Sequence, residues 1–242
     1  MNNDRLTILK EYVPALSDAQ LDQFMRYYEM LIETNRVMNL TAITDFDEVV
    51  IKHFADSLAI SLVFADTHKK DEPSLLDVGT GAGFPGIPIK IAYPEMHVTL
   101  IDSLGKRVNF LQQVIDELDL GSTGSMEAVH SRAEDYVHEP GIRESFDYVT
   151  SRAVASLNVL SEYALPYVIK GGYFIAYKSE RSEEEMNDAA SALKILGGEI
   201  SKIHGFTLPG SDIGRTLISI KKTCPSPDKY PRKAGLPSKK PL

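Results

Sequence analysis

A glycine-rich loop between two apolar runs constrains the fold of this chain more than any other feature. Residues 75–78 read LLDV and predict a short buried strand. The loop that follows carries four glycines, Gly79, Gly81, Gly83 and Gly86. A helix is expected from Pro88 to Tyr93, and a second strand over residues 98–101 ends on Asp102. Open α/β sheets bind nucleoside cofactors with such a unit, because glycines let the backbone approach a ligand closely.

The glycine spacing indicates which cofactor the loop would hold. Residues 77–83 read D-x-G-x-G-x-G, which resembles the loop of class I S-adenosylmethionine (SAM) methyltransferases. Asp77 precedes the first glycine, where it can approach the amino group of the methionine moiety. Residues 81–86 also fit G-x-G-x-x-G, the dinucleotide fingerprint. A tight turn without a ligand is the third interpretation, but ordering so many glycines costs backbone entropy. We favour SAM.

Acidic residues follow the second and third strands. Asp102 ends the second strand, where a carboxylate can accept both hydroxyls of a ribose. A third strand is expected over residues 127–130, and Glu134 and Asp135 come shortly after it. These two carboxylates either bind an adenine amino group or form a helix N-terminal charge pair, which the macrodipole favours.

Basic residues follow the fourth and fifth strands. The fourth strand is expected over residues 146–150, with Arg152 at its carboxyl end. Ligands of open α/β sheets lie at this edge, so Arg152 either contacts a ligand or pairs with a structural carboxylate. A fifth strand over residues 173–177 is followed by Lys178.

Charge and composition exclude several classes of protein. The chain has 242 residues, a net charge of −8 and one cysteine, Cys224, so it has no internal disulfide and no cysteine-based metal site. No run of about 18 apolar residues predicts a membrane span. The polar start lacks a signal-peptide core, and we therefore expect a cytoplasmic protein. Residues 221–242 hold seven Lys or Arg and one acid, and this basic segment allows RNA contact despite the acidic remainder.

The chain is expected to have three parts. Residues 1–66 predict a helical extension, in which Ser17 and Gln20 fit a capping box before a stripe of apolar residues at helical spacing. Residues 73–222 contain the strands and form the cofactor-binding domain. Residues 223–242 are a basic, proline-rich tail, expected to be extended and without a core of its own.

Seven short motifs occur together along the chain. They are NLTAIT (39–44), HFADSL (53–58), DVGTGAGFPGIP (77–88), LIDSLGKR (100–107), RAE (132–134), SRAV (151–154) and YPRKAGLP (230–237). In register from about residue 35 to the C-terminus, they resemble the small-subunit rRNA methyltransferase G family. The chain departs from the family at Ser179, because the family usually has glycine after the lysine that corresponds to Lys178.

The resemblance implies a fold, an activity and a set of cofactor contacts. The fold is that of a class I SAM-dependent methyltransferase: a Rossmann-like, seven-stranded, mostly parallel sheet with helices on both faces and an N-terminal helical extension. The activity is methylation of N7 of one guanine in 16S rRNA of the small ribosomal subunit. The residues that carry over as SAM contacts are Gly79, Phe84, Ala133, Glu134 and Arg152. With the loop and strand positions above, Asp77, Gly81, Gly83 and Asp102 complete the expected cofactor site.

The implied reaction needs no strong base and no metal. Guanine N7 has a free lone pair and no proton to lose, so the enzyme supplies proximity, alignment and a suitable electrostatic surface. Our candidates for contact with the target base are Asn39, His53, Arg152, Lys178 and Arg215. Asn39 is alternatively a helix C-cap, Arg215 a strand-edge charge, and His53, three residues before Asp56, a structural histidine.

The basic tail gives a further link to RNA. Cations expected to contact rRNA phosphates are Lys221, Lys222, Arg232, Lys233, Lys239 and Lys240. The alternative is a solubilising, disordered end, but the resemblance to the family at residues 230–233 favours a packed or RNA-contacting segment. Other functions that remain open are a methyltransferase for a small molecule or protein, a non-catalytic ribosome-assembly or nucleotide-binding module and, more remotely, a nicotinamide-dependent oxidoreductase. We expect a monomer.

Overall fold

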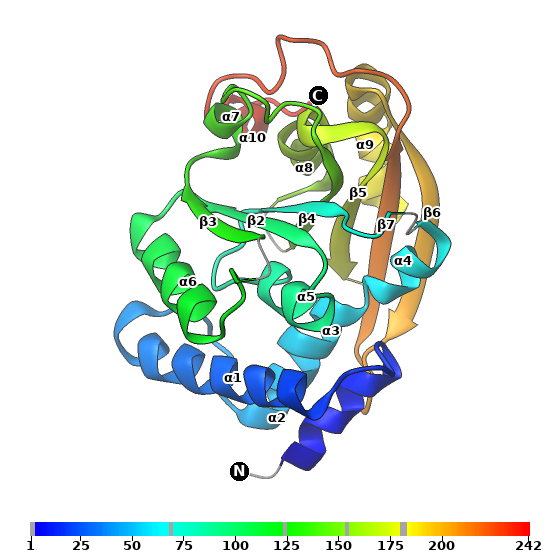
Figure 1. Cartoon of the computed structure of the whole chain (residues 1–242). Helices are drawn as coiled ribbons and strands as arrows, with labels where there is room; N and C mark the ends of the chain where they lie inside the picture. The colour runs from blue at the N-terminus through cyan, green and yellow to red at the C-terminus, as the bar shows by residue number, and fades with distance from the viewer. Residues whose placement is uncertain (1–2, 68–69, 123–124, 153–154, 180–182) are drawn as a thin grey trace.

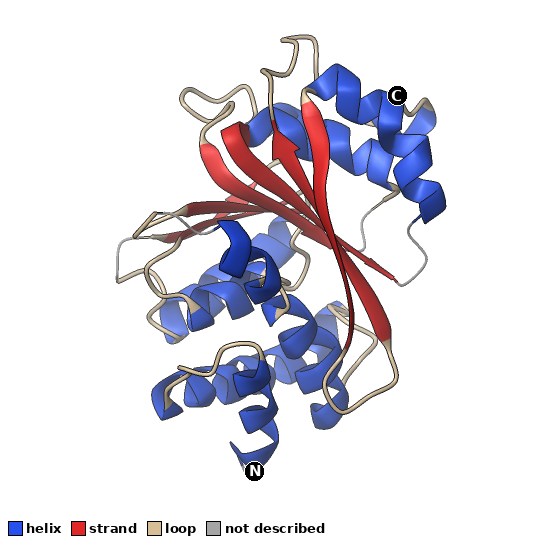
Figure 2. Cartoon of the chain, turned by 90° about the vertical axis from the view of Figure 1, so that its right-hand side faces the viewer, coloured by secondary structure: helices blue, strands red, loops and turns tan. Residues whose placement is uncertain are grey.

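A seven-stranded sheet runs through the middle of the molecule (Figures 1 and 2). The computed structural model describes residues 3–67, 70–122, 125–152, 155–179 and 183–242. The strands are β1 (Ser74–Val78), β2 (His97–Asp102), β3 (Met126–His130), β4 (Phe146–Arg152), β5 (Val168–Ser179), β6 (Gly198–Thr207) and β7 (Gly214–Lys222). Their order is β3-β2-β1-β4-β5-β7-β6, and β7 runs antiparallel to both of its neighbours. The expected mostly parallel α/β sheet is confirmed.

The strand order reverses between β1 and β4. From β1 the chain builds outward through β2 to β3, and it then returns to place β4 on the other side of β1. The connections after β1 and β4 therefore diverge at the carboxyl ends of these two strands, which opens a crevice between them. Ligands of open α/β sheets bind at this point.

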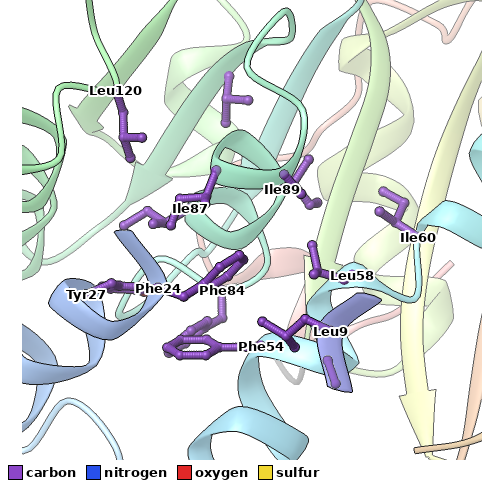
Figure 3. Packing of buried hydrophobic residues seen from close by; sticks show 14 of the residues in the cluster. Leu9, Phe24, Tyr27, Phe54, Leu58, Ile60, Phe84, Ile87, Ile89 and Leu120 are labelled. Atoms are coloured by element: carbon purple, nitrogen blue, oxygen red, sulfur yellow. The ribbon is translucent and has the colours of Figure 1, made fainter. Parts of the chain in front are cut away.

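Helices from the N-terminal half of the chain cover one face of the sheet (Figure 2). They are η1 (Asn3–Glu11), α1 (Asp18–Met38), α2 (Phe46–Val49), the π-helical turn η2 (Val50–Ala55), α3 (Asp56–Leu58), α4 (Ser61–Thr67), α5 (Gly86–Ala92) and α6 (Gly105–Glu117). Their apolar side chains join Leu75, Leu100 and Tyr148 of the sheet in one core. Figure 3 shows part of that core, where Phe54, Phe84 and Ile87 meet.

The opposite face carries the helices that follow β3. They are α7 (Ala133–Tyr136), α8 (Leu157–Ala164), η3 (Leu165–Tyr167), α9 (Glu183–Leu196) and the short C-terminal α10 (Leu236–Lys239). Leu76, Ile101 and Val149 point into this second core, each next in sequence to a residue of the first. Alternate strand side chains point to opposite faces, which explains why the strands read as continuous apolar runs.

The N-terminal helices hold the glycine-rich loop in place. The predicted capping box is present, since Gln20 N–H donates to Ser17 Oγ and the Gln20 side chain accepts from the Ser17 N–H. The buried stripe of α1 includes Phe24 and Tyr27, and the Tyr27 hydroxyl donates to the carbonyl oxygen of Ala82 at 2.6 Å. The helices of residues 1–66 thus share one core with the sheet and touch the loop directly.

The C-terminal segment (residues 223–242) packs against the second face instead of extending freely. Tyr230 is 7% exposed, and Arg232 binds both carboxylate oxygens of Glu162, with an Nη2–Oε2 distance of 2.6 Å. Lys222, at the end of β7, is fully buried and pairs with Glu144 at 3.0 Å. The expectation that Lys222 and Arg232 contact rRNA is therefore wrong, because both cations are used inside the fold. The remaining cations of that set, Lys221, Lys233, Lys239 and Lys240, are exposed.

Candidate active site

A cavity of about 630 Å³ lies at the carboxyl ends of β1 and β2. Seven of the nine residues expected to bind the cofactor line it: Gly79, Gly81, Phe84, Asp102, Ala133, Glu134 and Arg152. They come from the loop after β1, the tip of β2, the start of α7 and the tip of β4. The parallel strands bring these separate segments to one edge of the sheet, as the sequence predicted.

Asp77 does not reach this cavity. Its side chain is fully buried and accepts hydrogen bonds from Thr80 Oγ1 at 2.6 Å and from the N–H of Gly86 at 3.0 Å. The expectation that Asp77 approaches a ligand amino group is corrected by these contacts, which direct the carboxylate at the loop itself. Burial raises the pKa of Asp77 to about 6, although the hydrogen bonds act in the opposite direction. Asp77 therefore shapes the loop from beneath.

Gly83 also faces away from the cavity. Its φ of 104° lies in the region that favours glycine. A Cβ at this position would lie 2.4 Å from Ile87 Cδ1 and 2.8 Å from the Tyr27 hydroxyl. The glycine spacing predicted a cofactor contact for Gly83, whereas the structure uses this glycine for close packing of α1 against the loop.

Asp102 is fixed by the backbone around it. One carboxylate oxygen accepts from the N–H of Gly81 at 3.0 Å and from Arg107 Nη1 at 3.3 Å, and the other accepts from the N–H of Leu104 at 2.9 Å. A carboxylate offers about four lone-pair positions. Capacity therefore remains on the oxygens of Asp102 for a ligand hydroxyl in the cavity.

Arg152, His53 and Phe84 form a wall at one end of this first cavity. The imidazole of His53 stacks on the ring of Phe84, with 4.5 Å between centroids and an interplanar angle of 23°. The Arg152 guanidinium lies 4.9 Å from the Phe84 centroid, and its Nη2 is 3.4 Å from His53 Nδ1. Arg152 Nη1 also pairs with Asp56 Oδ2 at 3.0 Å. Both interpretations of Arg152 hold: it lines the cavity and pairs with a buried carboxylate.

A second cavity, of about 480 Å³, lies on the other side of this wall. His53 and Arg152 line both cavities, and Lys178 and Arg215 line the second. Four of the five candidates for base contact are thus brought together. Asp56 lies beneath them, 4% exposed, with Oδ1 3.4 Å from Arg215 Nε.

Ion pairs fix the orientation of the cations that line the second cavity. Lys178 Nζ pairs with Glu185 at 2.9 Å and donates to the carbonyl oxygen of Ala155 at 2.8 Å. Burial raises the pKa of Asp56, while Arg152 and Arg215 act to lower it. Cations held in this way offer their remaining N–H groups to an acceptor in the cavity.

Asn39, the fifth candidate, lines neither cavity. It is the C-cap of α1 in the left-handed conformation, with φ 51° and ψ 56°, and its N–H donates to the carbonyl oxygen of Asn35. Thr41, two residues later, lines the first cavity instead, with Oγ1 2.9 Å from His53 Nε2. The NLTAIT motif therefore reaches the site through Thr41.

Several side chains of the two cavities were not expected from the sequence. Among them are Thr41, Asp56, Arg107, Tyr163 and Ser238. Thr41, Asp56 and Arg107 belong to motifs already singled out, so a wider reading of those motifs would have found them. Nothing in the local sequence signals Tyr163 and Ser238, because they depend on packing between distant segments.

His53 is held in its neutral form. Burial, assisted by the charge of Arg152, lowers its pKa to about 3. The unfolded chain takes up a proton near the ordinary value of 6.5, whereas the native state excludes it. This contribution to stability is complete above pH 6.5 and is lost as the pH falls from 6.5 toward 3.

We predict that wild-type protein loses about 2 kcal/mol more stability than His53→Gln when the pH falls from 7 to 5. The difference between the two proteins isolates His53, because the opposite effect of Asp77 is present in both. Urea unfolding at the two pH values measures it. Equal losses in the two proteins would show that His53 titrates normally in the native state.

Among the described residues, no cluster of three His, Cys, Asp or Glu side chains has the arrangement of a metal site. In the same part of the chain, no helix combines the length and apolar character needed to cross a membrane.

Comparison with known proteins identifies the family. Residues 20–213 match the family described as rRNA small subunit methyltransferase G (GidB). The chain belongs to this family. It is 48% identical over 241 residues to the ribosomal RNA small subunit methyltransferase G of Leuconostoc mesenteroides, covering 100% of this chain and 99% of that protein. It is 52% identical over 227 residues to the protein of that name from Lachnoclostridium phytofermentans, covering 94% and 91%.

Solved structures share the fold at low sequence identity. TYW2 from M. jannaschii, in complex with AdoMet (SAM), has a TM-score of 0.51 and 11% identity, covering 64% of this chain and 72% of that chain. TrmN from Thermus thermophilus has a TM-score of 0.51 and 13% identity, covering 72% and 53%. The expected class I methyltransferase fold is confirmed, with the N-terminal helices of this family packed on one face of the sheet.

Proposed function

We propose that this enzyme transfers a methyl group from SAM to N7 of one guanine in 16S rRNA of the small ribosomal subunit, giving 7-methylguanosine. One observation carries the proposal: a cavity lined by the glycine-rich loop and a second cavity rich in cations share the wall of Arg152 and His53. A donor on one side of that wall and an acceptor base on the other would meet beside it. The family membership over nearly the whole chain supports the substrate class.

The residues of the first cavity suit SAM. Asp102 would accept the ribose hydroxyls, and Glu134, which follows β3, would accept from the adenine amino group. Gly79 and Gly81 leave room for the backbone to approach the ligand, both with positive φ. When bound, SAM supplies a methyl group activated by a positively charged sulfur. Phe84 and His53 present stacked rings toward the place where this group would lie.

The second cavity suits a guanine. Arg152, Lys178 and Arg215 can donate to guanine O6 and leave the N7 lone pair free for attack. N7 carries no proton, so a neutral His53 with a lowered pKa is compatible with the reaction. Methyl transfer places positive charge on the purine, and the carboxylates of Asp56 and Glu185 offset the surrounding cations. Both cavities are formed by one chain, so a monomer acting on ribosomal subunits in the cytoplasm suffices.

The test uses radiolabelled SAM with purified small ribosomal subunits and with free 16S rRNA. We expect label at a single guanine, and cleavage at the modified base should map it as N7-methylguanine. Label in protein or small molecules, with none in RNA, would support a methyltransferase of another substrate class. SAM binding without turnover on any substrate would support a non-catalytic assembly module.

We predict that Asp102→Ala weakens SAM binding about 10- to 100-fold. Hydrogen bonds to a charged group contribute about 1.5–3 kcal/mol, and the variant removes the acceptor expected to hold the ribose. Asp135→Ala is the matched control, because this exposed acid lies next to Glu134 but does not line the cavity. Isothermal titration calorimetry measures both affinities. Equal affinity of Asp102→Ala and wild type would remove Asp102 from the cofactor site.

A further inference from the structure

The C-terminal segment reaches the cofactor cavity. Ser238, in α10, lines this cavity together with Tyr163 of α8. Their hydroxyl oxygens lie 3.1 Å apart, so one donates to the other. Figure 1 shows the segment passing over the top of the molecule to place α10 beside α7 and α8. The sequence analysis assigned neither hydroxyl to a site.

The same segment contacts the acid expected to bind adenine. The N–H of Gly235 donates to Glu134 Oε1 at 3.3 Å, and Glu134 is 8% exposed. Glu134 and Tyr163 line the same cavity. Burial raises the pKa of Tyr163, and the negative charge of Glu134 acts in the same direction. Glu134, Tyr163 and Ser238 therefore form one polar cluster at the cavity.

Two anchors on either side hold Ser238 in position. Arg232 binds Glu162 through its backbone N–H at 2.8 Å and through its guanidinium, and Glu162 is fully buried. Arg232 Nη2 also donates to the carbonyl oxygen of Lys240 at 2.8 Å, which closes the segment into a loop that contains Ser238. Because Glu162 precedes Tyr163 on α8, one helix supplies both the anchor and the cavity hydroxyl.

The position of the cluster indicates which part of a ligand it would meet. Asp102 ends β2, and Glu134 follows β3, whereas Arg152 ends β4, on the other side of β1. The cluster around Glu134 thus lies at the nucleoside end of the cavity, away from the proposed methyl group.

We propose that Tyr163 and Ser238 bind the nucleoside end of the cofactor, so that docking of the C-terminal segment and cofactor binding stabilise each other. This inference rests on the proposed use of SAM. Each hydroxyl can donate to and accept from the purine or the ribose. The two effects are linked thermodynamically. The factor by which docking of the segment strengthens SAM binding equals the factor by which SAM binding favours the docked segment.

The first test measures affinity for SAM and for adenosine, which lacks the methionine part. Tyr163→Phe and Ser238→Ala should each weaken both ligands by about 3- to 10-fold, the value of one hydrogen bond. Lys239→Ala is the control, because this exposed neighbour does not line the cavity. Wild-type affinity in both variants overturns the inference and leaves the proposed function intact. Failure of the wild type to bind SAM overturns both.

The second test measures the reciprocal effect on the segment. Trypsin can cleave after Lys233, which is exposed within the segment. It can also cleave after Lys170, an exposed residue of β5 outside the segment, which serves as the reference site. Saturating SAM should slow cleavage after Lys233 more than cleavage after Lys170, and the excess protection should shrink in the Tyr163→Phe/Ser238→Ala double variant. Equal protection at both lysines would show that the segment is not coupled to the cofactor.

Discussion

Arg232→Ala protein will unfold in urea with a free energy about 3–5 kcal/mol below that of the wild type. The substitution removes the partner of Glu162, whose side chain is 1% exposed. In the native protein that carboxylate accepts from the guanidinium at 2.6 and 2.9 Å and from the Arg232 backbone N–H. Without the guanidinium, a buried charge either stays unpaired or takes up a proton, and both outcomes cost free energy.

Lys233→Ala provides the matched control, because Lys233 is exposed and adjacent in sequence. Its free energy of unfolding should stay within about 0.5 kcal/mol of wild type. Adding Glu162→Gln to Arg232→Ala should recover part of the loss, because the buried group is then uncharged. If Arg232→Ala is as stable as Lys233→Ala, the ion pair is not formed and the C-terminal segment is not anchored as described.

The internal ion pair of Arg232 limits which variants can test RNA binding by the C-terminal segment. A variant that changes Arg232 together with Lys233 would alter stability and surface charge at once. A lower salt dependence of RNA binding in that variant would therefore have two explanations. Phosphate contacts are tested on the exposed lysines alone, since a phosphate contact needs a cation that is free of internal partners.

The centre of the sheet could be predicted from the sequence because β1, β2 and β4 are buried on both faces. Such strands read as short apolar runs. The five strands expected over residues 75–78, 98–101, 127–130, 146–150 and 173–177 all lie within observed strands. The first residue of a helix was harder to predict from the sequence. The helix expected at Pro88 begins at Gly86, because Pro85 occupies the N-cap and the loop turns directly into the helix.

The edge of the site could be predicted, but the direction of individual side chains could not. Carboxyl ends of parallel strands converge, which placed Asp102 and Arg152 correctly. Asp77 stands two residues after Leu75 on β1 and therefore points to the same face, under α5. The alternation of side chains along β1 would therefore have predicted that the Asp77 carboxylate faces the loop.

Contacts between distant segments left no local signal. Asp56 and Arg152 are 96 residues apart, and Arg232 lies 70 residues from Glu162. A charged tail with five prolines is compatible with disorder, with RNA contact or with packing. Which of these occurs depends on the residues elsewhere in the fold that contact the tail. Those partners, Glu134, Glu162 and Tyr163, become visible once α7 and α8 are folded side by side.

Arg152→Ala will lower kcat/KM for methyl transfer to small ribosomal subunits by about 10²- to 10³-fold, the loss that follows removal of one preorganised donor at a reacting centre. Arg152 is the only residue of the described chain besides His53 that lines both cavities. Its guanidinium is held by Asp56 at 3.0 Å and lies over Phe84 at 4.9 Å, so it needs little reorganisation when substrates bind. A single-turnover assay with saturating SAM measures the chemical step.

Arg152→Lys separates the charge of this group from its shape. Lysine keeps the positive charge but lacks the planar guanidinium, which can donate to Asp56 and to a second acceptor at once. Most of the loss in kcat/KM should therefore remain in Arg152→Lys. Arg26→Ala is the control, because its ion pairs with Glu29 and Glu117 are exposed and remote from both cavities. Full activity in Arg152→Ala would contradict the shared wall as the place of methyl transfer. A fall in SAM affinity with an unchanged single-turnover rate would instead limit Arg152 to cofactor binding.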